Sequence, residues 1–237
     1  MIMRKLIFIA AVVAILAACS DMNDVHDVYL KDGERIYIGK VDSLKAFAGD
    51  NRVKLRFWAS DPRAKAVGFY WYPGNDSMIT EISHTSAADS FEVYIGGAAG
   101  VKTIQEGNYT LRVITRDDNN HFSVPFEKII NVYGDRFRSV LTDRVLKTVT
   151  YKAADASLSL TFAGQTSDRE IGVEISYTDL SGGALTVMKA NKDLSAAVKL
   201  LQVDVEKTVS YRTLFLPEPL AVDTFYTAGK EVFILTD

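Results

Sequence analysis

The sequence predicts an all-β protein of two tandem β-sandwiches that follow an export signal. Apolar and polar residues alternate in short runs bounded by turn residues, which is typical of half-buried strands. Three of these runs recur in order about 105 residues later, which indicates a duplicated module. A separate apolar stretch at the start of the chain ends at its only cysteine.

The first 18 residues have the order of a signal peptide. Basic Arg4 and Lys5 precede an apolar run at residues 6–16, and two alanines follow as a small-residue cleavage site. The run is too short for the roughly 30 Å of hydrocarbon that a transmembrane helix crosses. Leu16-Ala17-Ala18-Cys19 resembles a bacterial lipobox, which implies that Cys19 is acylated and becomes the new N-terminus. The alternative is a free, buried cysteine after an ordinary signal peptide.

Cleavage there would leave 219 residues with 25 basic and 30 acidic side chains, a formal charge of −5. This balance argues against a nucleic-acid partner. We expect a lipidated N-terminus and tether at residues 19–34 and attachment to the outer membrane. The acidic residues after Cys19 resemble surface-export signals, but a leader on the periplasmic face is an equal alternative.

Alternation predicts the strands of the first module in order. Residues 53–57 place Val53, Leu55 and Phe57 on one face, and Asp61-Pro62 turns the chain into a second strand. That strand turns Val67, Phe69 and Trp71 inward. Further strands are predicted at residues 91–95, 107–114 and 122–132.

The second module is predicted by comparison with the first. Residues 158–162 match 53–57 at an offset of 105, and residues 173–177 match 67–71 at 106. Residues 211–215 match 109–113 at 102. We therefore predict module one at residues 35–135 and module two at 136–237. Between them, residues 136–144 lack alternation and predict a short helical turn or linker.

The segment from Glu106 to Pro125 resembles the last two strands of a fibronectin type III domain and the turn between them. The resemblance implies two fibronectin type III or immunoglobulin-like sandwiches. It also implies that the hydroxyl of Tyr109 bonds back to the backbone, as in a tyrosine corner. An ordinary core aromatic is the alternative for Tyr109.

Several segments together resemble a lipoprotein family of unknown function from gut anaerobes. They are residues 31–40, Phe69 to Tyr72, Glu106 to Val113, and Tyr211 to Thr213 with Leu216 to Glu218. The resemblance implies fibronectin-like modules and genes near polysaccharide-uptake systems, and it assigns no functional residue.

Catalytic and metal-binding patterns are sparse. His26, His84 and His121 lie far apart in the sequence and are interpreted as surface loop residues. With Cys19 acylated no thiolate remains, and the sequence has no Gly-x-Ser-x-Gly elbow. Residues 117–120 could form an oxygen-rich cation site, but a polar turn fits them better. We expect no enzyme activity, no cofactor and no metal.

Outward-facing aromatics give the one positive indication of a ligand. Sugars stack apolar ring faces on aromatic side chains, and amides and carboxylates bind their hydroxyls. Alternation turns Trp58, Tyr70 and Tyr72 outward, and the next turn supplies Asn75 and Asp76. These five residues are the candidate ligand site, although a loop or the neighbouring module could equally cover the aromatics.

The sequence thus predicts a non-catalytic, lipid-anchored envelope protein that binds or presents glycan for an outer-membrane uptake complex. The alternative is an adhesin or fimbria-like subunit that pairs with protein partners through its sheet edges.

Overall fold

The computed structural model describes residues 36–86, 89–97 and 102–235. The chain divides into two units, Met1–Tyr37 and Ile38–Asp237, and every strand among the described residues belongs to the second. The predicted signal peptide, Cys19 and tether lie outside the described residues. Within the described part, no helix is long and apolar enough to cross a membrane.

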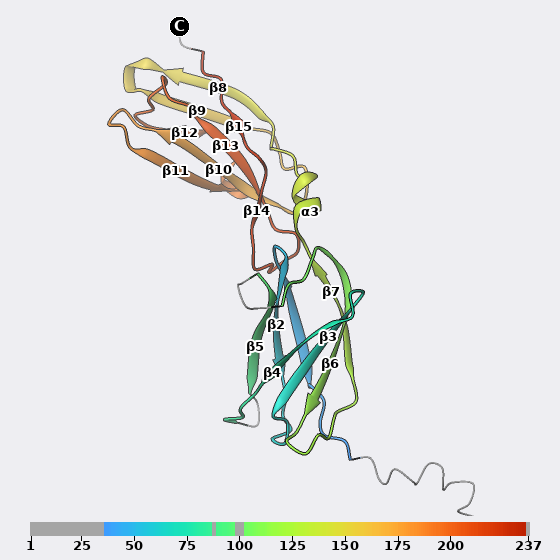
Figure 1. The fold of residues 1–237 in the computed structure, drawn as a ribbon. Helices are drawn as coiled ribbons and strands as arrows, with labels where there is room; N and C mark the ends of the chain where they lie inside the picture. The colour runs from blue at the N-terminus through green and yellow to red at the C-terminus, as the bar shows by residue number, and fades with distance from the viewer. Residues whose placement is uncertain (1–35, 87–88, 98–101, 236–237) are drawn as a thin grey trace, which may run out of the picture. The chain divides into compact units, whose positions relative to one another are not determined.

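In the part of the chain that the structure describes, seven strands form the first sandwich (Figure 1). Three of them make a sheet in the order β1-β2-β5, and four make a sheet in the order β4-β3-β6-β7. All pairings within the two sheets are antiparallel. The strands are β1 Ser43–Ala48, β2 Arg52–Trp58, β3 Ala66–Tyr72, β4 Asp76–Glu81, β5 Ser90–Gly96, β6 Gly107–Arg116 and β7 Phe126–Val132.

The second sandwich repeats this plan with sheets β12-β9-β8 and β11-β10-β13-β14, and a further short strand, β15, also pairs with β13. Its strands are β8 Leu146–Lys152, β9 Ser157–Phe162, β10 Glu170–Thr178, β11 Ala184–Ala190, β12 Val198–Leu200, β13 Ser210–Phe215, β14 Phe225–Tyr226 and β15 Lys230–Glu231. Two 3₁₀ turns, η1 Ala153–Asp155 and η2 Asn191–Asp193, lie between strands. The predicted all-β fold of two fibronectin type III-like sandwiches is confirmed by this shared strand order.

Each sandwich encloses its own core, and the alternation that predicted the strands accounts for it. Val53, Leu55, Phe57, Val67 and Phe69 have no exposed surface. They lie in one cluster that receives side chains from both sheets of the first sandwich. Leu158, Leu160, Val173 and Ile175 do the same in the second. Burial of these alternate positions is the main force that pairs each three-stranded sheet with its four-stranded partner.

Strand registers test the predicted repeat residue by residue. Val67 pairs with Thr115, and Val173 pairs with Thr213, so the match of Val67 to Val173 makes the two threonines equivalent. Tyr211 then corresponds to Val113. The predicted match of Tyr211 to Tyr109 is therefore wrong in register, although β13 does correspond to β6. The sequence comparison missed this because alternating strands match at any even shift.

A buried polar contact recurs at the corrected positions. Thr115 and Thr213 are fully buried. The backbone N–H of Thr115 donates to Ser123 Oγ over 3.0 Å, and that of Thr213 donates to Thr227 Oγ1 over 2.9 Å. Each threonine hydroxyl also bonds to the backbone ahead of the first strand of its sandwich, but in opposite directions. Thr115 donates to the Gly39 carbonyl, and Thr213 accepts from the Arg144 N–H. Each contact satisfies polar groups that burial would otherwise leave unpaired.

Tyr109 forms the predicted corner, because its hydroxyl donates to the Gln105 carbonyl over 3.0 Å. The Tyr211 hydroxyl also donates to a backbone carbonyl, but that carbonyl is Arg144, 67 residues away. The Tyr211 bond therefore ties the segment before β8 to β13 in the second sandwich, whereas the Tyr109 bond closes a local turn in the first.

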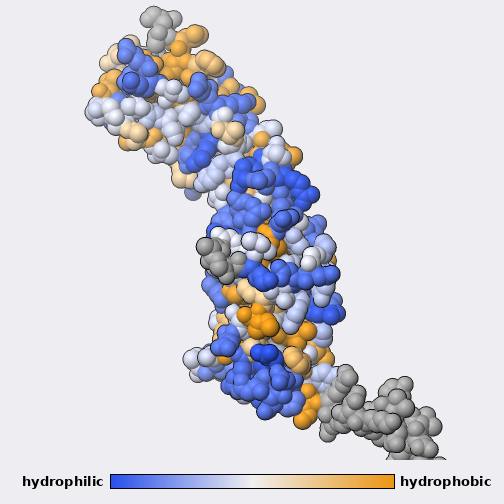
Figure 2. All heavy atoms as spheres, viewed as in Figure 1, coloured by the Kyte–Doolittle hydropathy of each residue, from blue (hydrophilic) through white to orange (hydrophobic). Residues whose placement is uncertain are grey.

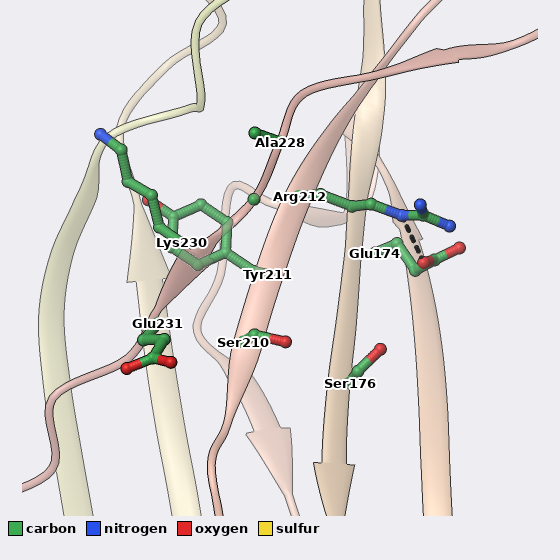
Figure 3. Close-up of a pocket in the computed structure, with 9 residues that line it drawn as sticks. Glu174, Ser176, Ser210, Tyr211, Arg212, Ala228, Lys230 and Glu231 are labelled. Carbon is green, nitrogen blue, oxygen red and sulfur yellow. Dashed lines mark hydrogen bonds and ion pairs between the residues drawn. The ribbon is translucent and has the colours of Figure 1, made fainter.

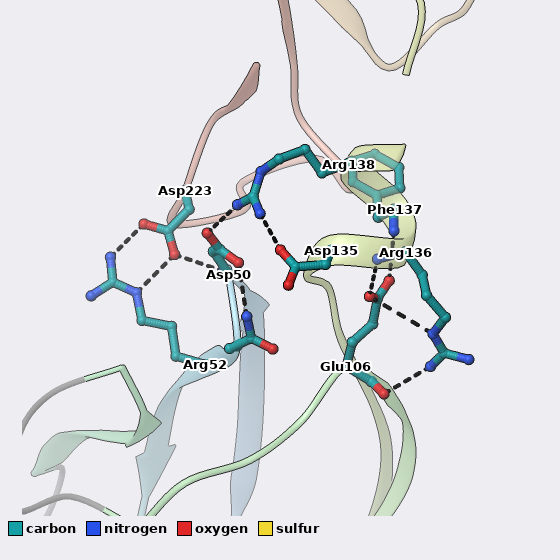
Figure 4. A network of polar contacts seen from close by, with 9 residues as sticks. Asp50, Arg52, Glu106, Asp135, Arg136, Phe137, Arg138 and Asp223 are labelled. Atoms are coloured by element: carbon teal, nitrogen blue, oxygen red, sulfur yellow. Dashed lines mark hydrogen bonds and ion pairs between the residues drawn. The ribbon is translucent and has the colours of Figure 1, made fainter. Parts of the chain in front are cut away.

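A helical turn, α3 Asp135–Ser139, follows β7 and confirms the turn predicted there (Figure 4). The Glu106 carboxylate accepts the N–H groups of Arg136 and Phe137 at 2.7 and 2.9 Å, which satisfies donors at the start of the turn. Nearby, Asp223 accepts from Arg52 Nε at 2.7 Å and from the Asp50 N–H at 2.9 Å. These hydrogen bonds, with the Arg52 ion pair, hold the pKa of Asp223 below its usual value despite partial burial.

Candidate functional site

The outer face of the sheet β4-β3-β6-β7 carries an aromatic platform. Tyr70 faces outward from β3, and its ring lies over Gly68 on the same strand. A methyl group at Gly68 would come within 2.8 Å of the ring carbon Cε2 and 2.9 Å of the hydroxyl. The missing side chain at Gly68 thus leaves the space beside β3 that the Tyr70 ring occupies.

Apolar side chains surround this ring. Gly68 pairs with Ile79 on β4 and with Ile114 on β6, so both isoleucines flank the platform. Phe122, which forms an isolated bridge with Arg116, lines the same shallow hollow. Ile79 is 56% exposed and Phe122 48%. Figure 2 shows apolar residues gathered on the visible face of the first sandwich, with hydrophilic residues around them. An exposed apolar cluster rimmed by polar groups is typical of a binding surface.

A polar cavity of about 410 Å³ adjoins the platform and shares Ala66 and Arg116 with it. Lys65, Glu81 and Asp118 supply charged groups to its lining. The combination can receive a ligand that has one apolar face and several polar substituents, since an apolar surface with a few placed polar groups is the usual make-up of small-molecule sites.

The hairpin between β3 and β4 follows Tyr72, which shares the outward face of Tyr70. Asp76 pairs with the buried Trp71, so the register places it on the opposite face from Tyr70. Tyr72 is 42% exposed and pairs with Thr110, and the next peptide bond, Tyr72–Pro73, is cis. Asn75 adopts a left-handed conformation with φ of 48° at the tip. Asp76 forms an ion pair of 2.8 Å with Lys102, and the hydrogen bond from this lysine is the main reason that the pKa of Asp76 is lowered.

Four of the five predicted site residues, Tyr70, Tyr72, Asn75 and Asp76, therefore belong to one strand and its hairpin. Trp58 does not join them, because it lies at the end of β2 in the other sheet and pairs with Ser43 and Ser90. It does face outward as predicted, and the Lys45 ammonium lies 5.8 Å from its ring centre. The two outward faces belong to opposite sheets, so Trp58 and Tyr70 cannot contact the same small ligand.

Other predicted polar features are internal to turns. The Asp117 carboxylate accepts the N–H groups of Asn119 and His121 and lies 2.8 Å from His121 Nδ1, which confirms a polar turn before β7. The prediction of a surface position is wrong for His84, whose side chain is only 10% exposed and packs edge-on against Phe91. His26 lies outside the described residues.

The sequence did not single out Gly68, Ile79, Ile114 and Phe122 as site residues. Alternation places Gly68 and Ile114 outward, but it does not show that a tyrosine ring needs the space above a glycine. A glycine inside a strand, two residues before an outward tyrosine, was the available signal.

A family model described as a domain of unknown function, DUF4998, matches residues 19–225. The chain belongs to the DUF4998 family. No curated protein sequence matches this DUF4998 chain.

Three solved structures show similarity to the DUF4998 chain. A two-domain fibronectin type III segment of chicken tenascin has 13% identity and a TM-score of 0.33, covering 84% of this chain and 100% of its own. The FN1–FN3 domains of chicken CNTN1 have 11% identity and a TM-score of 0.41, over 84% and 68%. Dimeric latent PorU from Porphyromonas gingivalis has 10% identity and a TM-score of 0.31, over 90% and 21%.

Proposed function

We propose that this DUF4998 protein is a non-catalytic, lipid-anchored component of the bacterial cell envelope that binds glycan on the outer face of its first sandwich. The Tyr70 ring, laid over Gly68 beside the polar cavity, is the observation that carries the proposal. A pyranose ring would stack its C–H face on Tyr70, and its hydroxyls would reach the groups that line the cavity around Arg116.

The anchor is supported by the lipobox-like Leu16-Ala17-Ala18-Cys19 and by the family match, which begins at residue 19. Acyl chains each contribute roughly 0.8 kcal/mol per buried methylene, and several chains attach a protein firmly. The placement on the outer membrane and the role beside a polysaccharide-uptake complex come from the family resemblance. A nucleic-acid partner conflicts with the acidic charge balance.

Arg112, which pairs with Tyr70 across the strands, contacts Glu127 over 3.1 Å. The cation beside the platform is thus already paired with a carboxylate, which suits binding better than catalysis. A glycosidase would be expected to place two carboxyl groups on either side of the scissile bond, one as acid and the other as nucleophile or base. We therefore propose recognition without bond cleavage.

Calorimetric titration of the purified full chain with a panel of plant and host oligosaccharides tests the proposal. Stacking predicts binding to at least one of them and a loss of about 30-fold in affinity for Tyr70→Ala. Tyr94→Ala is the control, because Tyr94 is an exposed tyrosine on β5 of the other sheet and lies away from the platform. No binding to the panel, or equal losses for both variants, would overturn the glycan assignment.

A second candidate function, protein pairing through a sheet edge, is favoured by one strand. β11 lies at the edge of its sheet, and Leu185 and Met188 on it are 41% and 59% exposed. Exposed edge strands with apolar side chains can add a strand from another chain. Concentration-dependent polymers of the detergent-extracted protein, abolished by Leu185→Lys, would favour this function over glycan binding.

A further inference from the structure

The second sandwich carries an open groove of about 550 Å³ on the sheet face that corresponds to the platform (Figure 3). Register places four oxygen-bearing side chains in one row across its strands. Glu231 on β15 pairs with Ser210, Ser210 pairs with Ser176, and Ser176 pairs with Thr186 on β11. Figure 3 shows Ser210 and Ser176 on the floor, with Glu231 to one side.

In the first sandwich, large side chains stand at three of the four positions of the same row. Glu127, Arg112, Tyr70 and Ser77 pair there in the corresponding order. Ser176 therefore stands where the first sandwich has Tyr70, and Ser210 stands where it has Arg112. The exchange of two large side chains for two serines opens the groove and replaces a stacking surface with hydroxyl groups.

The next row supplies a fixed wall. Glu174 replaces Gly68 and Arg212 replaces Ile114, as their cross-strand partners show. Arg212 Nε donates to Glu174 Oε1 over 2.7 Å, and the guanidinium lies 3.9 Å from the centre of the Tyr226 ring. A guanidinium held by a carboxylate and a ring has little side-chain entropy left to lose on binding, while its other N–H groups can still donate.

A bulge between β14 and β15 forms the third side of the groove. Tyr226 pairs with Leu214, but Lys230 pairs with Tyr211, so one extra residue is accommodated between β14 and β15. Gly229 takes a φ of +88° there, and Ala228 and Gly229 line the groove with almost no side chain. Bulges of this kind often occur beside binding sites because they redirect the strand edge.

We propose that this groove is a second binding site, separate from the Tyr70 platform, and that it takes a neutral, hydroxyl-rich ligand such as a sugar unit. Two acidic and two basic side chains line it, Glu174, Glu231, Arg212 and Lys230, so the lining has no formal net charge. The hydroxyls of Ser176 and Ser210, which line the groove, can both donate and accept, which matches the hydroxyls of a sugar. The site holds its ligand by hydrogen bonds along the row, in contrast to the stacking proposed for the first sandwich.

Methyl NMR of the full chain tests the two sites independently. With Ile, Met and Ala methyl groups labelled, two methyl groups report on the groove: Ala228 lines it, and Met188 pairs with Glu174 of its wall. Ile79 and Ile114 report on the platform. Neutral gluco-, xylo- and manno-oligosaccharides at up to 10 mM are the probes, and an oligogalacturonate of equal length is the charged comparison. We expect at least one neutral probe to shift Ala228 and Met188, with the charged comparison weaker.

Paired variants separate this inference from the proposed function. Removing both floor hydroxyls in Ser176→Ala/Ser210→Ala should weaken groove binding about ten-fold, since each removes a hydrogen bond of modest net value. Tyr70→Ala should leave the Ala228 response unchanged. No response at Ala228 and Met188 to any neutral probe would overturn the groove site. Stronger binding of the charged probe would overturn the neutral-ligand assignment, whatever Ile79 and Ile114 report.

Discussion

The ring of Tyr70 occupies the space that a side chain at Gly68 would need, with only 2.8 Å between the ring and the position of a Gly68 methyl group. Gly68→Ala should therefore lift the ring off the sheet. The free energy of unfolding should stay constant or rise by up to about 1 kcal/mol, because alanine suits a strand better than glycine and the ring is free to move. Affinity for the bound oligosaccharide should fall, as calorimetry would measure.

Denaturant unfolding of Gly68→Ala separates the two effects. A variant that unfolds like the wild type and binds less well shows that the ring position matters. Unchanged affinity in the folded variant would show that the platform is not the contact surface. Gly107→Ala is a useful comparison, because its methyl group would meet the Tyr109 ring at an ordinary distance of 3.4 Å.

Much of the fold could be predicted from the sequence. One face of each strand is buried, so apolar and polar residues alternate clearly along it. Val53, Phe57, Val67 and Phe69 are examples of correct core predictions. The equivalence of Tyr211 to Val113 could not be predicted in this way. Alternation repeats every two residues, so it does not determine which residues of two strands pair. The platform depends on the conformation of the Tyr70 ring over Gly68. The separation of Trp58 from Tyr70 depends on which sheet each strand joins. Neither is encoded in local alternation.

Two tyrosines should differ in their contribution to stability. Tyr109→Phe removes an exposed hydrogen bond of 3.0 Å, and we expect a loss of about 0.5–1 kcal/mol. Tyr211→Phe removes a buried bond of 2.8 Å to the Arg144 carbonyl, and we expect a loss of about 1–3 kcal/mol because that carbonyl loses a buried donor. Urea unfolding of both variants measures which of the two losses of stability is larger. Equal losses would contradict the difference in burial.

Breaking the buried ion pair of the second sandwich should be more costly. Arg144 Nη1 lies 3.0 Å from Glu170 Oε1, and the two side chains are 5% and 1% exposed. Glu170→Leu should lower the free energy of unfolding by about 3–5 kcal/mol, because a buried guanidinium loses its counter-charge. A double-mutant cycle with Arg144→Met measures the coupling. Strictly additive losses would show that the charges do not interact.

Acid should destabilise the protein through carboxylates such as Asp61. Hydrogen bonds from Arg63 and the Gly39 N–H hold the pKa of Asp61 well below its usual value. A lowered pKa in the folded state stabilises the protein above the unfolded value of about 3.9, and this contribution is lost as the pH falls through the folded value. Stability should therefore decline below about pH 4.

Asp61→Asn isolates this contribution, because asparagine can still accept the Gly39 N–H but does not titrate. The loss of stability between pH 7 and pH 3, measured by urea unfolding, should be smaller in this variant than in the wild type. Asp118→Asn corrects for the change in net charge, since Asp118 is an exposed residue of the turn after β6. An undiminished pH dependence in Asp61→Asn would contradict the assignment.

Acylation of Cys19 should attach the protein to the membrane. Expressed in a Gram-negative host, the wild-type chain should incorporate labelled palmitate and sediment with membranes, because several acyl chains hold a protein that a single chain would release. Cys19→Ser should incorporate no label. Inhibition of lipoprotein signal peptidase should leave residues 1–18 attached, which mass spectrometry detects. An exported wild-type chain with a free thiol at Cys19 would exclude the anchor and leave the glycan sites to be tested as those of a secreted protein.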